Sequence, residues 1–260
     1  MLLDNCALFD SHLHIIDPRF PLIANHGYLP PTFTVNDYRD RMRAYHLVGG
    51  AVVSGSFQGF DQGYLRASLE ALGPAFVGVT QIPIDTSDRE IQSLDAAGVR
   101  AVRFNLKRGG SEDVRHLDRL ARRVHELVGW HAELYVDASE LESLSRTLTA
   151  LPAVSIDHLG LSAAGLPTLL RLAAGGVRVK ATGFGRTDLD VRTAITAIYD
   201  ANPHALMFGT DLPSTRAPRP FEDADFLTVI DCLGEEAARQ VLCDNARKHY
   251  RCDRGMVSRA

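Results

Sequence analysis

The chain has 260 residues, of which 45% are hydrophobic and 23% are charged, and this ordinary globular composition excludes extensive disorder. It carries 28 lysines and arginines against 32 aspartates and glutamates, a formal net charge of −4, which argues against a nucleic-acid-binding surface. The 10 histidines stand out, because histidine serves both as a metal ligand and as an acid or base near neutral pH.

Short apolar segments alternate with longer amphipathic segments along the chain, which indicates strands alternating with helices. Eight strands are predicted, at residues 7–15, 49–57, 75–82, 99–106, 131–137, 153–160, 177–184 and 205–211. Helices are predicted after them, at residues 34–46, 61–72, 86–98, 114–129, 139–151, 166–175, 188–200, 221–234 and 235–250. The strand–helix unit recurs every ~32 residues, the size of a βαβ repeat in a parallel sheet.

This alternation predicts one closed (β/α)8 barrel, a fold that takes about 250 residues. A doubly wound sheet is the competing architecture, but it carries a glycine-rich turn after its first strand. Here the first strand runs into Ser11-His12-Leu13-His14 instead. We predict a barrel domain over residues 1–250 and a polar tail over residues 251–260.

The four cysteines, Cys6, Cys232, Cys243 and Cys252, form no CxxC pair, which indicates reduced thiols rather than a disulfide framework. The first ten residues show no basic segment before an apolar one, and no run of about 18 apolar residues occurs. We therefore expect a soluble, cytoplasmic protein with no membrane partner.

Polar residues gather at the predicted strand ends, where barrel enzymes place their chemistry. They are Asp10, His12, His14, Arg103, Asn105, Tyr135, Asp137, Asp157, His158, Lys180, Thr182, Arg186 and Asp211. His12 and His14 are two residues apart and should share one face of their strand. Taken singly, each residue has a structural explanation: a hydrogen-bonded core histidine, a turn-forming aspartate or a salt-bridged rim arginine. Two arginines together with histidines favour a ligand that carries carboxylates.

Several segments carry a family resemblance in the right order along nearly the whole chain. They are FDSHLHIID, GVRAVRFNL, HAELYVD, VSIDHLG, VKATGFGR, MFGTDLP and DNARKHY. The chain resembles the amidohydrolase superfamily, and its branch is similar to the 2-pyrone-4,6-dicarboxylate lactonases. The resemblance implies catalytic roles for His12, His14, His158 and Asp211. It implies substrate binding by Arg103, Tyr135 and Arg186.

The chain departs from the wider superfamily at the positions that hold a second metal. A two-metal centre there needs a bridging Lys or Glu on strand four and a His on strand five. This chain offers Arg103, Asn105, Tyr135 and Asp137 at those strand ends, so a two-metal centre is not expected. The lactonases it resembles work without a metal, and we expect no cofactor. A single Zn²⁺ or Mn²⁺ on His12, His14 and Asp211, with or without His158, stays open as the alternative.

The leading hypothesis is a hydrolase that opens a small, carboxylate-bearing lactone such as 2-pyrone-4,6-dicarboxylate. Asp211 would take a proton from water with a pKa tuned toward neutrality, and the histidines would polarise the ring carbonyl. The alternatives are a mononuclear metal-dependent hydrolase or decarboxylase acting on another carboxylate-bearing substrate, and a non-catalytic anion-binding barrel. A homodimer is left open.

Overall fold

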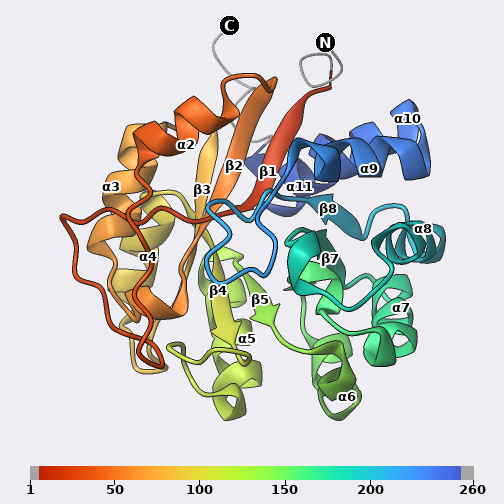
Figure 1. The fold of residues 1–260 in the computed structure, drawn as a ribbon. Helices are drawn as coiled ribbons and strands as arrows, with labels where there is room; N and C mark the ends of the chain where they lie inside the picture. Colours follow the sequence, from red (N-terminus) through yellow and green to blue (C-terminus); the bar gives the residue numbers. More distant parts are fainter. Residues whose placement is uncertain (1–5, 253–260) are drawn as a thin grey trace, which may run out of the picture.

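Eight parallel strands form one sheet in the order β1 to β8 in the computed structural model, which describes residues 6–252. Figure 1 shows the strands surrounded by helices. The strands are β1 (Leu8–Leu13), β2 (Leu47–Val53), β3 (Phe76–Thr80), β4 (Val99–Asn105), β5 (His131–Tyr135), β6 (Val154–Ile156), β7 (Arg178–Ala181) and β8 (Leu206–Phe208). The predicted (β/α)8 barrel is therefore confirmed; seven strands lie inside their predicted ranges, and β2 begins two residues before its predicted range of 49–57.

The predicted helices are all present, and most are shorter than predicted. They are α2 (Val35–Met42), α3 (Gly63–Leu72), α4 (Asp88–Ala96), α5 (Leu117–Val128), α6 (Leu141–Ala150), α7 (Leu166–Ala174), α8 (Val191–Ala201), α9 (Asp223–Leu233), α10 (Glu235–Arg239) and α11 (Asn245–His249). The helix predicted at 235–250 is interrupted by a π-helical turn at Gln240–Asp244. Side chains of Thr34 and Ser87 accept hydrogen bonds that begin α2 and α4.

No helix in residues 6–252 is both long and apolar enough to cross a bilayer. The domain limit at residue 250 stays a prediction, and most of the predicted tail, residues 253–260, lies outside the described part of the chain.

The ends of β1 and β8 are joined by backbone hydrogen bonds that close the barrel. The Asp211 amide donates to the His12 carbonyl oxygen at 2.7 Å, and the His14 amide donates to the Leu212 carbonyl oxygen at 2.7 Å. Gly209 permits this approach, because a Cβ there would lie only 2.6 Å from the His12 nitrogen. This seam brings His12, His14 and Asp211 together.

Asp10 takes part in the seam but does not share the face of the two histidines. The pairing register of β1 shifts between Asp10 and Leu13, so the simple alternation of faces is broken there. The Asp10 carboxylate accepts hydrogen bonds from Tyr38 on α2 and from both the amide and the hydroxyl of Thr210. Burial raises the pKa of Asp10 to about 6, and these hydrogen bonds act against the rise. Asp10 thus ties β1 to β8 and to α2, and it does not reach the pocket.

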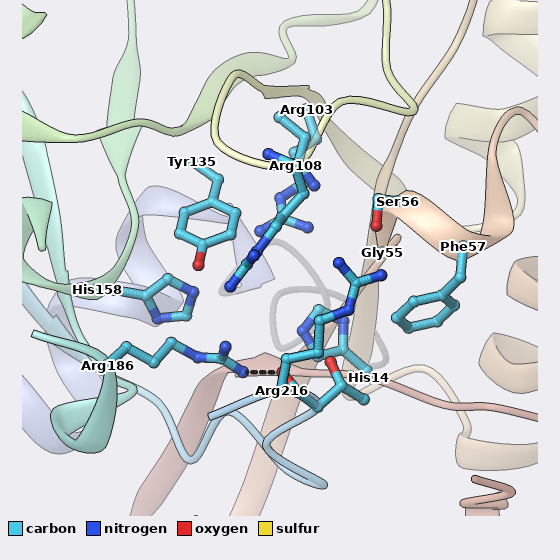
Figure 2. A pocket seen from close by; sticks show the side chains of 12 residues that line it. His14, Gly55, Ser56, Phe57, Arg103, Arg108, Tyr135, His158, Arg186 and Arg216 are labelled. Carbon is cyan, nitrogen blue, oxygen red and sulfur yellow. Dashed lines mark hydrogen bonds between the residues drawn. The ribbon is translucent and has the colours of Figure 1, made fainter. Parts of the chain in front are cut away.

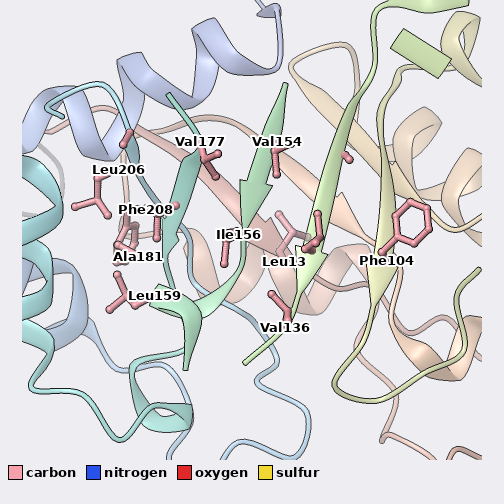
Figure 3. Packing of buried hydrophobic residues seen from close by; sticks show 14 of the residues in the cluster. Leu13, Phe104, Val136, Val154, Ile156, Leu159, Val177, Ala181, Leu206 and Phe208 are labelled. Carbon is pink, nitrogen blue, oxygen red and sulfur yellow. The ribbon is translucent and has the colours of Figure 1, made fainter. Parts of the chain in front are cut away.

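Apolar side chains fill the space between the strands and the helices, where Figure 3 shows Val154, Ile156, Val136 and Phe104. A second apolar cluster includes Phe9, Ala51, Val53, Val77, Val79 and Tyr250. Tyr250, which follows α11, stacks on Phe9 of β1 with ring centroids 5.8 Å apart. The strand ends beyond this apolar layer are free to carry polar groups.

Candidate active site

A pocket opens where the strands end, and it is lined by groups from β4 and β5 and from the loops after β1, β2, β4, β6, β7 and β8. Figure 2 shows Tyr135, His14, His158 and several arginines pointing into it. The lining residues are His14, Gly55, Ser56, Phe57, Arg103, Asn105, Arg108, Tyr135, His158, Arg186, Thr215 and Arg216. Four of the twelve are arginines, so the pocket is suited to an anion.

The four predicted catalytic residues meet at the base of this pocket. Asp211 Oδ1 lies 3.6 Å from His14 Nε2 and 3.9 Å from His12 Nε2. The His12 and His158 rings are 4.9 Å apart. All four side chains are buried, with exposed fractions of the residues between 0 and 5%. We refer to His12, His14, His158 and Asp211 as the histidine–aspartate cluster.

Arg186 is bound to this cluster. Its Nε donates to Asp211 Oδ2 at 2.6 Å, and its terminal nitrogen donates to the Thr215 carbonyl oxygen at 2.8 Å. Burial raises the pKa of Asp211, but the charges of Arg186 and His158 outweigh burial and hold it well below the usual value. The expected pKa near neutrality is therefore wrong. Asp211 is an ionised carboxylate in the free protein.

The proton position on His14 follows from its backbone contact. His14 Nδ1 lies 2.7 Å from the Val53 carbonyl oxygen. A carbonyl oxygen can only accept, so Nδ1 carries the proton in this contact. In the tautomer with a single ring proton on Nδ1, Nε2 offers a lone pair toward Asp211. His14 can therefore accept a proton from water, or bind a cation, at this nitrogen.

Four charged side chains lie beneath the cluster inside the barrel: Arg103, Glu133, Asp157 and Lys180. We refer to them as the charged floor; their exposed fractions are 0 to 2%. Lys180 Nζ is 2.5 Å from Glu133 Oε2, and Arg103 donates to Asp157 Oδ2 at 2.7 Å. Two cations face two carboxylates, which avoids an uncompensated buried charge.

The predicted substrate-binding residue Arg103 belongs to this floor. It lines the pocket, but its terminal nitrogens already donate to Asp157 and to the Ser54 carbonyl oxygen. Glu133 was not singled out in the sequence, although the alternation in HAELY places it on the same face as Tyr135. That alternation is the signal that could have revealed it.

His12 rests on the floor through its second ring nitrogen. His12 Nδ1 lies 3.3 Å from Lys180 Nζ and 3.3 Å from Asp157 Oδ1. Burial lowers the pKa of His12 well below its usual value, although Asp157 acts in the opposite direction. His12 is therefore a neutral imidazole.

The cluster fits a divalent metal ion by the chemistry of its donors. His12 Nε2, His158 Nδ1 and Asp211 Oδ1 are buried and have no hydrogen-bond partner among residues 6–252. His12, His158 and Asp211 can each place one ligand atom within 4.8 Å of the others. Two nitrogens and one oxygen make a ligand set that Zn²⁺ accepts, with a further position open for water.

Two arginines in the pocket were missed by the sequence reading, because they lie in loops beyond the strand ends. Arg108 follows β4, and Arg216 follows β8 and lies over the ring of Tyr28 at 4.3 Å. Neither has an acidic partner within salt-bridge distance in the part of the chain that the structure describes. The Asn105 side chain accepts a hydrogen bond from the Arg108 amide, which fixes the start of that loop.

Tyr135 is the last residue of β5, and Asp137 lies two residues beyond it; their side chains have different surroundings. The hydroxyl of Tyr135 points into the pocket, and its ring contacts His158 at 4.8 Å (Figure 2). Asp137 instead accepts hydrogen bonds from Ser139, Ser162 and Lys107, so it holds the loop that begins the next helical turn. Tyr135 is thus available to a ligand, and Asp137 serves the structure.

A family model described as amidohydrolase matches residues 9–252. A 2-pyrone-4,6-dicarboxylate hydrolase from Comamonas testosteroni is 32% identical over 156 residues, which cover 58% of this chain and 51% of that relative. The matched segment thus spans about half the length of that relative.

Two further similarities cover most of the chain. A D-galactarolactone isomerase from Agrobacterium fabrum is 25% identical over 251 residues, covering 88% of this chain and 86% of that protein. A crystal structure of a candidate 2-pyrone-4,6-dicarboxylic acid hydrolase from Pseudomonas putida superimposes with a TM-score of 0.79. It is 26% identical and covers 95% of this chain and 98% of its own.

Proposed function

The chain belongs to the amidohydrolase family, and we propose that it hydrolyses a carboxylate-bearing lactone, 2-pyrone-4,6-dicarboxylate or a close analogue. One observation carries this proposal. Arg108 and Arg216 face the pocket without an acidic partner among the described residues, directly above an ionised aspartate and three histidines. Both terminal nitrogens of Arg216 already donate to Asn25, and a substrate carboxylate would give each of the two guanidinium groups an ionic partner. The aspartate and histidines supply the groups that ester hydrolysis needs.

Water is activated between Asp211 and His14 in this proposal. Asp211 Oδ1 and His14 Nε2 are 3.6 Å apart, and both are acceptors when His14 is neutral. A water molecule that donates one hydrogen to each would be held with its lone pair free. As its oxygen attacks the lactone carbonyl, one of its protons passes to Asp211.

The ring carbonyl is polarised by donors from β1 and from the loop after β6. His12 and His158 reach the same point as Asp211, and an N–H from either would stabilise the oxygen that becomes negative. The ring C–O bond then breaks, and the departing ring oxygen takes up the proton that water lost. The product is the open-chain acid, so water and lactone balance.

The arginines and Tyr135 hold the substrate in the pocket. Arg108 and Arg216 bind its carboxylates, and Tyr135 contributes a hydroxyl beside Arg186 and His158. The Arg186 guanidinium already donates to Asp211, so a substrate carboxylate beside Arg186 would share that guanidinium with Asp211. Orientation of an anionic ring over the activated water is the main contribution of these residues.

A divalent ion held by His12, His158 and Asp211, with His14 beside them, would polarise the carbonyl and acidify water. The proposal assigns the same tasks to the protein groups alone. We therefore propose that hydrolysis proceeds without a bound metal ion.

Ultraviolet absorbance tests the substrate class directly, because ring opening removes the pyrone chromophore. Purified protein should consume 2-pyrone-4,6-dicarboxylate and should act at least about 10²-fold more slowly, in kcat/KM, on a pyrone that lacks one carboxylate. Equal rates on both pyrones would overturn the dicarboxylate assignment. Rearrangement of D-galactarolactone without ring hydrolysis, followed by NMR, would instead assign a lactone isomerase.

A further inference from the structure

Lys180 lies inside the barrel, directly below the histidine–aspartate cluster, and the proposed mechanism does not use it. It is fully buried on β7 and contacts Glu133, Asp157 and His12. We infer that Lys180 is a positioning residue that keeps the single ring proton of His12 on Nε2, where it points at the reacting carbonyl. Its expected effect on kcat rests on the proposed function, whereas the proton position does not.

The hydrogen-bond geometry at His12 Nδ1 favours Lys180 as the partner. The Nζ–Nδ1 distance of 3.3 Å has acceptable hydrogen-bond angles. An ammonium group has only donors, so Nδ1 must be the acceptor in this contact. A neutral imidazole that accepts at Nδ1 carries its proton on Nε2.

Asp157 is the competing partner, and it would produce the opposite tautomer. Its Oδ1 is also 3.3 Å from His12 Nδ1, but it has no hydrogen-bond partner with suitable geometry among the described residues. A proton on Nδ1 would moreover face the Lys180 ammonium. The position of Lys180 therefore disfavours the tautomer that Asp157 would select.

Neighbouring groups hold Lys180 in place. Glu133 Oε2 lies 2.5 Å from Nζ, and the Tyr250 hydroxyl donates to the same oxygen at 3.2 Å. Arg103 occupies the other oxygen of Asp157. Arg103 and Lys180 therefore each have a carboxyl partner in the floor, in Asp157 and Glu133 respectively.

The tautomer decides what His12 can do in the cluster. With a proton on Nε2, His12 donates a hydrogen bond to an oxyanion. With Nε2 unprotonated, His12 could bind a metal ion through Nε2. Its Nδ1–H would then donate to Asp157, which is the usual arrangement in zinc sites. Lys180 thus biases the cluster toward hydrogen-bond catalysis and against metal binding at His12.

Nuclear magnetic resonance of the wild-type protein tests the inference without any substitution at Lys180. In protein labelled with ¹⁵N-histidine, long-range ¹H–¹⁵N correlations distinguish the two tautomers, and His12→Gln identifies the His12 signals by their absence. We expect a protonated Nε2 and a bare Nδ1. The reverse pattern would overturn the inference, whatever substrate the protein uses.

Lys180→Met adds a second readout, with Ser155→Ala as a matched change of a buried polar residue on neighbouring β6. Lys180→Met should move the His12 proton to Nδ1, lower kcat by about 10²-fold with little change in KM, and raise zinc affinity about tenfold. Lys180→Gln retains an N–H donor and should restore the Nε2 proton. Ser155→Ala should change none of these quantities.

Two outcomes separate the inference from the proposed function. An unchanged His12 tautomer in folded Lys180→Met protein would overturn the positioning role. A wild-type His12 with its proton on Nε2, in a protein without lactonase activity, would sustain the inference and overturn only the proposed function.

Discussion

At the scale of single residues, Arg186 connects substrate binding with the strength of the proposed base. In the free protein its guanidinium is shared between Asp211 and the Thr215 carbonyl oxygen. A substrate carboxylate that competes for this guanidinium would weaken its hold on Asp211 and let the pKa of Asp211 rise. The base would then become stronger only when substrate is bound.

Asp211→Asn tests the base itself. Asparagine keeps the size and much of the hydrogen bonding of the side chain but cannot take the proton of water. We expect kcat to fall by about 10²-fold or more, with little change in KM. Steady-state kinetics on the dicarboxylate provide the measurement, and a near-normal kcat would remove Asp211 from the role of base.

Arg186→Met and Arg108→Met form a matched pair that separates base tuning from anchoring. Without Arg186, the pKa of Asp211 rises, so more of it is protonated at low pH. The acid limb of the kcat/KM profile should therefore move to higher pH in Arg186→Met. Arg108→Met should raise KM and lower kcat/KM by the equivalent of about 2–4 kcal/mol. The acid limb of its kcat/KM profile should stay at the wild-type pH. Identical pH profiles for the two variants would contradict the coupling of Arg186 to Asp211.

The four residues that the sequence was expected to bring together, and that do lie together in the structure, share a simple physical signal. His12, His14, His158 and Asp211 lie where strands end, and chain order with strand periodicity suffices to bring them together. Arg108 and Arg216 escaped prediction because loop conformation, not periodicity, decides where they point. The pairing of Arg103 with Asp157 also depends on three-dimensional neighbours and could not be read from spacing.

At the scale of elements, the seam between β1 and β8 determines the geometry of the site. Gly209→Ala would place a Cβ 2.6 Å from the His12 nitrogen, in a position where only backbone movement can relieve the contact. We expect a loss of roughly 1–3 kcal/mol in unfolding free energy, measured by urea denaturation, together with reduced kcat. Gly175→Ala, at φ −77° and with a nearest contact of 3.3 Å, is the control and should change stability by less than about 1 kcal/mol. Equal stability of the two variants would show that the close approach is not required.

The last helix, α11, lies at the barrel end opposite the pocket and packs the half-buried His249 against the buried His131. His249 and His131 have ring centroids 3.9 Å apart, and burial together with Arg178, Lys180 and Arg251 lowers the pKa of His249 to about 3. In the unfolded chain His249 has a pKa near 6.5, so below that pH it binds a proton in the unfolded chain but not in the folded protein. Acidification below about pH 6.5 therefore favours unfolding. The stabilising effect of this neutral histidine is therefore lost progressively from about pH 6.5 downward.

His249→Phe should remove the part of the acid sensitivity that His249 contributes, while keeping an aromatic ring against Tyr250; the buried His12, His131 and His158, whose pKa values are also lowered, remain in both proteins. Between pH 7 and pH 5, the wild type should lose about 2 kcal/mol of unfolding free energy relative to the variant. Glu133 and Asp10, whose pKa values burial raises to about 7 and about 6, act in the opposite direction but are present in both proteins. Denaturation curves at both pH values test this, and parallel pH dependences would contradict it.

Over the whole chain, the repeated strand–helix unit made the fold predictable. The hydrogen bonds that close the barrel between β1 and β8 brought the site residues together. Each strand–helix unit is marked by its own local pattern, so eight weak signals reinforced one another. The π-helical turn at Gln240–Asp244 and the shifted register after Asp10 were not predicted. The π-helical turn packs against β1 and β8, and the register shift lies in the pairing of β1 with β2, so both involve residues distant in sequence that no local pattern reports.

If this barrel opens a dicarboxylate lactone with protein groups alone, one sample should combine full activity with the absence of bound metal. Protein is treated exhaustively with a chelator, its zinc and manganese content is determined, and ring opening of 2-pyrone-4,6-dicarboxylate is followed in the same sample. We expect undiminished activity at a metal content of less than about one tenth of an ion per chain, far below the single ion that a mononuclear site requires. Activity that disappears with the metal and returns with Zn²⁺ or Mn²⁺ would show instead that a mononuclear metal site carries out the hydrolysis.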